Sequence, residues 1–210
     1  MSVAFPSMKR PLVAILRGVK PEEAEAIVGE LIAAGMTAIE IPLNSPDPFR
    51  SIGAAVKLAP AGVLIGAGTV LTAADVDRLN DVGGKLMVSP NVDTTVLARA
   101  HQHGMVTMPG VFSPTEALLA ARSGASSLKF FPASVLGASG IAAIRAVLPT
   151  GVMIAAVGGV SDQNFAEYIK GGVTAFGLGS SLYKPGMTAA DVAARARATI
   201  AAYDRAIAKD

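Results

Sequence analysis

Three charged residues occur in or at the end of short apolar runs that otherwise predict buried strands. Arg17 ends the first run, Glu40 lies inside the second and Lys129 lies inside the sixth. An unpaired charge buried in a strand is costly, so such positions indicate chemistry rather than packing. Burial and a nearby cation such as Arg17 both lower the pKa of a lysine, whose neutral amine attacks ketones. The sequence therefore predicts that Lys129 forms a Schiff base.

The alternative for Lys129 and Glu40 is an ion pair that only holds the protein together. It is the weaker interpretation, because a buried ion pair stabilises poorly compared with apolar packing. Side chains alternate along a strand, so Phe131 falls on the same side as Lys129, and Leu128 and Phe130 fall on the other. We expect Phe131 to give the amine an apolar wall.

Polar residues and glycines follow other predicted strands. Thr69 follows the third run, where a helix cap is the alternative role, and Pro90 and Asn91 follow the fourth. Glycines at strand ends let backbone N–H groups approach an anion, and a short helix beginning near Ser180 would direct its positive end there. Tight turns are the alternative for these glycines. The glycines are Gly158 and Gly159 after the seventh run, and Gly177 and Gly179, followed by Ser180, at the end of the eighth, and these two loops are where the fold recurrently binds phosphate.

The sequence offers few metal ligands. It has no Cys, and its two histidines, His101 and His103, fall at the end of the fourth predicted helix. Residues two apart on a helix point to different sides, so these two cannot share a metal. We expect solvated surface histidines, no metal site and no cofactor, with an imine as the electron sink.

The elements that position these residues alternate between apolar runs and amphipathic segments. Such alternation predicts a parallel sheet with right-handed crossovers. Eight units in 210 residues predict a (β/α)8 TIM barrel formed as a single domain by residues 1–210. An open doubly wound sheet is the alternative, but the first run lacks a glycine-rich dinucleotide turn. The runs are Leu12–Leu16, Ala38–Pro42, Leu64–Ala67, Leu86–Ser89, Val106–Pro109, Ser127–Phe130, Met153–Ala156 and Ala175–Gly177.

Helix boundaries are also readable in the sequence. Thr72 and Ser113 each stand three residues ahead of a carboxylate, as in a capping box. Further helix starts are expected at Pro21, Pro46–Pro48 and Asp93. Left-handed glycines are expected to end helices at Gly35, Gly83, Gly104, Gly124 and Gly171.

Composition excludes several classes of protein. The chain is 51% hydrophobic and 16% charged, with a net charge of +2 and scattered basic residues. Scattered charge argues against nucleic-acid binding, and no apolar stretch reaches the roughly 18 residues of a membrane helix. The opening residues lack the basic and apolar regions of a signal peptide. We expect a soluble cytoplasmic protein.

Six segments, spread along nearly the whole chain, resemble the KDPG/KHG aldolase family of class I pyruvate aldolases. Within that family they are most similar to the galactonate-type branch. Gluconate-type members usually have an Arg where this chain has Asn44, and tend to have a Thr where it has Val157. The segments are Ala14–Gly18, Glu40–Pro46, Gly66–Leu71, Ser89–Asn91, Leu128–Pro132 and Ala156–Val160.

The resemblance implies a role for each candidate residue. Lys129 would form the Schiff base and Glu40 would be the proton shuttle. The substrate would be a phosphorylated 2-keto-3-deoxy sugar acid, cleaved to pyruvate and glyceraldehyde 3-phosphate by a homotrimer that needs no cofactor. Arg17, Thr69, Pro90 and Phe131 would line the substrate site, and Gly158, Gly159, Gly179 and Ser180 would hold the phosphate.

Other functions fit parts of the pattern. The same reaction on the gluconate epimer is one alternative. A phosphosugar isomerase could use Glu40 as its base and the same phosphate loops, but this leaves Lys129 without a role. A barrel that binds phosphometabolites without catalysis is the non-enzymatic alternative.

Overall fold

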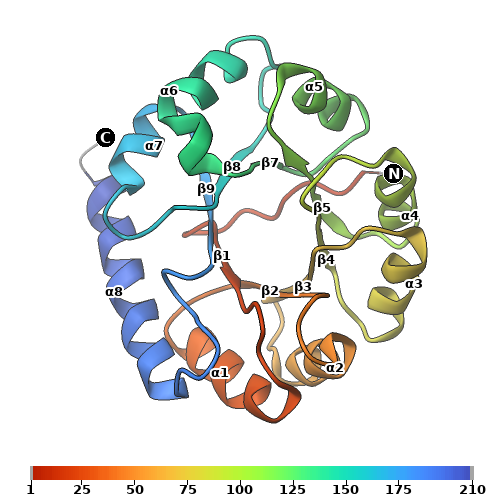
Figure 1. Cartoon of the computed structure of the whole chain (residues 1–210), viewed down its shortest axis with the longest axis vertical. Coiled ribbons are helices and arrows are strands. Elements are labelled where there is room, and N and C mark those ends of the chain that lie inside the picture. The colour runs from red at the N-terminus through yellow and green to blue at the C-terminus, as the bar shows by residue number, and fades with distance from the viewer. Residues whose placement is uncertain (1, 209–210) are drawn as a thin grey trace.

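The predicted apolar runs form the strands of a parallel barrel, and the helices surround it (Figure 1). The structure is a computed structural model that describes residues 2–208. The strands are β1 (Leu12–Ile15), β2 (Ala38–Pro42), β3 (Leu64–Gly68), β4 (Leu86–Val88), β5 (Val106–Met108), β6 (Gly110–Val111), β7 (Leu128–Phe130), β8 (Ile154–Val157) and β9 (Ala175–Leu178). The helices are α1 (Pro21–Ala33), α2 (Pro48–Leu58), α3 (Ala73–Asp81), α4 (Thr94–Gln102), α5 (Pro114–Arg122), α6 (Ala133–Arg145), α7 (Phe165–Lys170) and α8 (Ala189–Ile207).

The region of the fifth apolar run differs from the prediction, because a short strand, β6 at Gly110–Val111, follows β5 just beyond the run. Pro109 separates β5 from β6, and a proline has no N–H to donate to a strand ladder. The strand order is β5-β4-β3-β2-β1-β9-β8-β7-β6, with every pairing parallel. Its two ends, β5 and β6, are consecutive in the chain. The predicted barrel is therefore confirmed, and the open doubly wound sheet is excluded.

Alternation along the strands separates two apolar clusters. One cluster includes Val13, Ile15, Ala38 and Ala155, and it fills the barrel interior. The larger cluster contains the alternate residues of the same strands, which face outward and pack against the surrounding helices. Phe131 packs against the interior cluster, whereas Leu128 and Phe130 belong to the outer one. Lys129 therefore points into the barrel, as predicted.

The helix ends follow the predicted pattern with two exceptions. Thr72 accepts a hydrogen bond from the Asp75 N–H at the start of α3, but the Asp75 carboxylate accepts from the Thr72 hydroxyl, so the capping box predicted there is incomplete. Ser113 forms the predicted capping box at the start of α5. Gly35, Gly83, Gly104 and Gly124 have the expected positive φ. The prediction for Gly171 is wrong: its φ is −74°, and the left-handed residue is Gly172.

The segment before β1 crosses the amino-terminal end of the barrel (Figure 1). Val3, Phe5 and Met8 pack against the interior cluster. The Arg10 guanidinium donates two hydrogen bonds of 2.7 Å to Asp204 on α8. This segment thus closes the end of the barrel opposite the predicted site. Between residues 2 and 208, no helix is both long and apolar enough to span a membrane.

Candidate active site

Lys129 lies in the middle of β7, and its side chain is buried, with 7% of the residue exposed. The Nζ atom donates a hydrogen bond of 3.1 Å to the carbonyl oxygen of Ser89, just after β4. It also lies 4.7 Å from the centroid of the Phe131 ring. The predicted apolar wall beside the amine is therefore present. The Ser89 carbonyl and the Phe131 ring together position the amine in a largely apolar environment.

Glu40 lies in β2 and is 2% exposed. Its neighbour on β3 is Gly66, and Gly68 lies two residues further along the same strand. A Cβ atom on Gly68 would overlap the Glu40 carboxylate, so the carboxylate occupies space that only a glycine leaves open. Within residues 2–208, the Oε2 atom is buried and has no hydrogen-bond partner. An unpaired buried acceptor of this kind is available to a proton or a substrate hydroxyl.

Burial shifts the pKa values of both groups toward neutrality. Desolvation raises the pKa of Glu40 from 4.5 to about 7, although Lys129, Arg17 and the Gly68 N–H oppose the shift. Desolvation lowers the pKa of Lys129 from 10.5 to about 8; Arg17 lowers it further, while Glu40 opposes the change. A neutral amine and a carboxyl that exchanges its proton near pH 7 are what imine chemistry requires.

The alternative of a structural ion pair is not what the geometry favours. Among the salt bridges within residues 2–208, no contact of 4.0 Å or less joins Lys129 to Glu40. The two groups influence each other through space, and each keeps polar atoms available to a ligand.

Arg17 lies two residues beyond the end of β1 and is exposed at the mouth of the barrel. Its Nη1 atom donates a hydrogen bond of 2.6 Å to Oδ1 of Asn44, two residues beyond the end of β2. The register of these strands pairs Ile15 with Glu40, so the residues that follow them are neighbours.

Thr69 and Pro90 each adjoin a residue that contacts the reactive pair. Thr69 follows Gly68, and its φ of 55° places a β-branched residue in the left-handed region, which is costly. The alternative role of Thr69 as a helix cap is wrong, because Thr72 caps α3. Pro90 follows Ser89, whose carbonyl holds the Lys129 amine.

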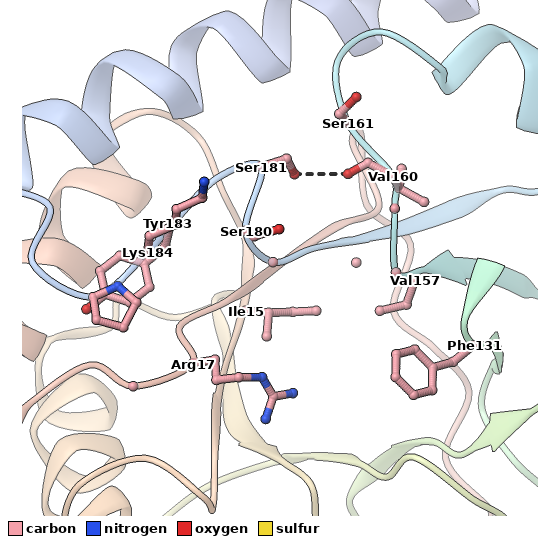
Figure 2. A pocket seen from close by; sticks show the side chains of 16 residues that line it. Ile15, Arg17, Phe131, Val157, Val160, Ser161, Ser180, Ser181, Tyr183 and Lys184 are labelled. Carbon is pink, nitrogen blue, oxygen red and sulfur yellow. Dashed lines mark hydrogen bonds between the residues drawn. The ribbon is translucent and has the colours of Figure 1, made fainter. Parts of the chain in front are cut away.

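A cavity of about 580 Å³ opens at the carboxyl ends of β1, β7, β8 and β9 (Figure 2). Its lining includes every residue predicted to hold phosphate, together with two predicted to bind substrate. Lys129 and Glu40 do not line it, but Phe131 contacts the Lys129 amine and also forms part of the cavity wall. These lining residues are Arg17, Phe131, Gly158, Gly159, Gly179 and Ser180.

The two glycine-containing loops face each other across this cavity. The Ser181 hydroxyl donates a hydrogen bond of 2.9 Å to the Val160 carbonyl and joins the loops, while the Ser180 hydroxyl points into the space between them (Figure 2). Gly158 and Gly159 have φ values of 90° and 78°, which favour glycine. The loops thus present small groups and backbone N–H donors to the cavity.

One detail of the predicted phosphate site is wrong. Ser180 begins a single turn, in which the N–H groups of Leu182 and Tyr183 both donate to the Gly179 carbonyl, and no helix of the described chain begins there. A side chain on Gly159 would strike Ser134 in the first turn of α6 and would not enter the cavity. Gly179 is the position where a Cβ atom meets open space.

The histidine prediction is also partly wrong, since both side chains have protein partners. His103 Nε2 lies 2.7 Å from Oδ1 of Asp77, which also accepts a hydrogen bond from Arg99. His101 Nε2 lies 3.4 Å from the Thr107 hydroxyl. Neither histidine lines the cavity. No cluster of three or more His, Cys, Asp or Glu suited to a metal occurs within residues 2–208.

Several site residues escaped sequence reasoning. The Ser89 carbonyl accepts a hydrogen bond from Lys129, and the Asn44 amide oxygen accepts one from Arg17. The missing side chain of Gly68 leaves room for the Glu40 carboxylate. Ser89 ends one predicted strand and Asn44 follows another, and these positions were a usable indication. Lys184 also lines the cavity, from a loop with no strand pattern near it.

Fold and site together define a β/α barrel with a lysine and a carboxylate buried in its interior. A family model described as KDPG and KHG aldolase matches residues 7–198. This chain therefore belongs to the KDPG and KHG aldolase family.

Individual relatives agree with this assignment. A protein of Rhizobium meliloti (strain 1021), named probable 2-dehydro-3-deoxy-6-phosphogalactonate aldolase, is 72% identical over 96% of this chain and 95% of its own length. The 2-dehydro-3-deoxy-6-phosphogalactonate aldolase of Escherichia coli (strain K12) is 46% identical over 95% of this chain and 97% of its own.

Two solved structures are equally similar in fold. One, described as a native KDPGal structure, has a TM-score of 0.94 and 46% identity, and covers 96% of this chain and 98% of its own. The other is a cube-shaped cage designed by fusing symmetric oligomeric domains, again with a TM-score of 0.94 and 46% identity, over 96% of this chain and 75% of its own.

Proposed function

We propose that this protein cleaves 2-dehydro-3-deoxy-6-phosphogalactonate to pyruvate and D-glyceraldehyde 3-phosphate through a Schiff base at Lys129. The observation that carries the proposal is the buried Lys129 amine, whose pKa is lowered to about 8 and which lies beside a buried carboxylate. A phosphosugar isomerase or a binding protein would have no use for a lysine held in this state.

Imine formation needs one proton donor. The neutral Lys129 amine attacks the C2 ketone and gives a carbinolamine. Glu40, with its pKa raised to about 7, is partly protonated at neutral pH and donates a proton to the carbinolamine hydroxyl. Water then leaves as the iminium forms, and Glu40 remains as a carboxylate.

Cleavage uses the same carboxylate in the opposite direction. Glu40 takes the proton of the C4 hydroxyl, the C3–C4 bond breaks, and its electron pair moves into the iminium. Glyceraldehyde 3-phosphate departs as the aldehyde, and an enamine of pyruvate remains on Lys129. Glu40 returns its proton to C3, and water hydrolyses the resulting iminium to free pyruvate and the amine. A group used both as acid and as base works best with a pKa near the working pH.

The two ends of the substrate carry anions that need separate partners. Arg17 lies at the cavity mouth and supplies positive charge for the C1 carboxylate. Gly158, Gly159, Gly179 and Ser180 lie across the cavity, where backbone N–H donors and one hydroxyl suit the phosphate. Thr69 and Pro90 flank the positions that hold Glu40 and Lys129, and they would contact the hydroxyls between the two anions.

The galactonate epimer is the substrate that similarity favours. The relatives of 72% and 46% identity are both named for it, and both are matched over nearly their whole length. Cleavage of the gluconate epimer is the alternative, and comparing turnover of the two C4 epimers distinguishes them.

We also propose that residues 1–210 act as one barrel domain in a cytoplasmic homotrimer. Oligomerisation is supported by the similarity to a cage built from symmetric oligomeric domains. A cytoplasmic location suits a substrate whose phosphate and carboxylate prevent it from crossing membranes. Sedimentation at several protein concentrations tests the trimer, and a monomer at micromolar concentration would contradict it.

Borohydride reduction tests the central proposal. Wild-type protein incubated with pyruvate and borohydride should gain one reduced pyruvate, and peptide mapping should place it on Lys129. Lys129→Ala should gain none and should not cleave the sugar acid. An adduct on Lys184, or no adduct on the wild type, would contradict the assignment.

A further inference from the structure

Asn44 makes a contact that the mechanism above does not use. Its side-chain oxygen accepts a hydrogen bond of 2.6 Å from Nη1 of Arg17, although both side chains are exposed to solvent. An exposed arginine ordinarily samples many rotamers, and fixing one of them costs entropy. A short hydrogen bond at the mouth of a site therefore needs a reason.

The segments that carry these two residues are also joined by two other hydrogen bonds. The Gly18 N–H donates a hydrogen bond of 2.9 Å to the Ser45 hydroxyl, and the Leu16 N–H donates one of 3.0 Å to the Glu40 carbonyl. These bonds already hold the two loops together. The Arg17–Asn44 contact is thus not required for loop attachment, and its effect falls on the guanidinium itself.

The partner of Arg17 is neutral, and this choice has an electrostatic consequence. Within residues 2–208, no carboxylate lies within 4.0 Å of Arg17, and Asn44 is its one hydrogen-bond partner. An aspartate in place of Asn44 would orient the guanidinium equally well but would neutralise it. An amide oxygen occupies one of the five N–H donors and leaves the positive charge intact.

We propose that Asn44 is a positioning residue that directs the Arg17 guanidinium into the cavity, with its charge unneutralised, to receive the carboxylate of a 2-keto acid. In Figure 2 the guanidinium extends from the loop after β1 toward the side of the cavity that Phe131 forms. Phe131 also contacts the Lys129 amine, so an anion held by Arg17 lies on the side of the cavity nearest the reactive nitrogen.

The intact charge also acts on the reactive pair. The charged groups that influence Lys129 are Glu40 on β2 and Arg17 beyond β1; Arg17 favours the neutral amine. Neutralising Arg17 would therefore raise the pKa of Lys129 and reduce the fraction of amine able to attack. Orientation and charge give different experimental signatures, so they can be separated.

Two substitutions at the exposed position 44 test the proposal, which rests on the proposed Schiff-base function. Asn44→Ala removes the acceptor and should raise the KM for pyruvate about tenfold, as expected for loss of one hydrogen bond to a charged group. Its KM for glyceraldehyde 3-phosphate should not change. Asn44→Asp should raise the pyruvate KM further and move the pH midpoint of borohydride trapping upward. Asn80→Asp, the same change on the outer helix α3, is the matched control.

A neutral ketone separates carboxylate binding from a general effect on Lys129. Asn44→Ala should weaken trapping of pyruvate but not of hydroxyacetone, which has no carboxylate. An unchanged pyruvate KM in Asn44→Ala, or equal losses for both ketones, would overturn the proposal while leaving the Schiff base established. Failure of wild-type protein to be trapped by pyruvate would instead overturn the function on which the proposal rests.

Discussion

Replacing Glu40 by Gln should make the protein more stable at pH 8 while it destroys activity. The Glu40 carboxylate is buried, and within residues 2–208 one of its oxygens has no partner. Gln has almost the same shape and stays neutral at every pH. The substitution therefore keeps the packing around Gly68 and removes only the cost of ionising a buried carboxyl.

The size of the effect follows from the pKa of Glu40. Burial raises it from 4.5 to about 7, so the folded protein holds this proton more tightly than the unfolded chain does. The stabilisation is fully present below pH 4.5 and is lost as the pH rises through about 7. Since each tenfold change in proton affinity is worth about 1.4 kcal/mol, the wild type should lose roughly 3 kcal/mol that Glu40→Gln keeps. In the wild type, the lowered pKa of Lys129 changes stability mainly between pH 8 and 10.5, above the range in which Glu40 titrates.

Urea denaturation of both proteins at pH 5, 6, 7 and 8 measures this difference. Protein concentration must be equal throughout, because oligomerisation adds to apparent stability. Subtracting wild type from variant cancels the titrating groups that do not interact with Glu40, and Glu25→Gln on the exposed face of α1 controls for the loss of one acidic residue. Turnover should fall by roughly 10²–10⁴-fold, as for loss of a general acid–base group. A difference in stability that stays constant with pH, or that favours the wild type at pH 8, would refute the reasoning.

Four further predictions concern the same site. Gly179→Leu fills open cavity space, so it should displace charge-assisted hydrogen bonds to the phosphate and raise the KM for phosphorylated aldehyde at least tenfold. Slow trapping of pyruvate should survive this change, and the effect of Ser180→Ala should be milder. Equal damage to both assays would place the phosphate elsewhere. The rate of pyruvate trapping at Lys129 should rise with pH and level off above about 8, and a midpoint near 10.5 would contradict the lowered pKa. Gly68→Ala should displace the Glu40 carboxylate and reduce kcat by about 100-fold. The control Gly29→Ala, in α1 with only ordinary contacts, should keep full activity and gain about 0.5–1 kcal/mol. Activity should survive EDTA, because the iminium serves as the electron sink; a loss that divalent ions restore would count against the Schiff base.

The fold and the reactive pair could be predicted because they depend on local alternation. A strand residue two positions from an interior neighbour must also face the interior, which places Lys129 and Glu40 inside the barrel. The identity of the main strands was equally local, but the short strand β6, which follows Pro109, was not predicted.

Contacts between loops could not be predicted in the same way. The Arg17–Asn44 bond depends on the register between β1 and β2, which one sequence does not specify. The expected helix at Ser180 failed for a related reason. Glycine and serine allow either a helix or a single turn, and the hydrogen bonds to the other loop decide between them. His103 looked like a surface residue until Asp77, on a different helix, was placed beside it.

The pairing of β1 with β9 has a consequence for how the protein is made. Leu12 pairs with Phe176, so the ribosome must synthesise most of the chain before the first strand acquires its second neighbour. Contacts between residues so distant in sequence slow folding and leave strand edges unpaired meanwhile. Glu40 and Lys129 come from opposite halves of the chain and meet only when that last pairing closes the ring. In a refolding experiment, capture of pyruvate should therefore appear only after secondary structure has formed, which makes the reactive lysine a reporter of barrel closure.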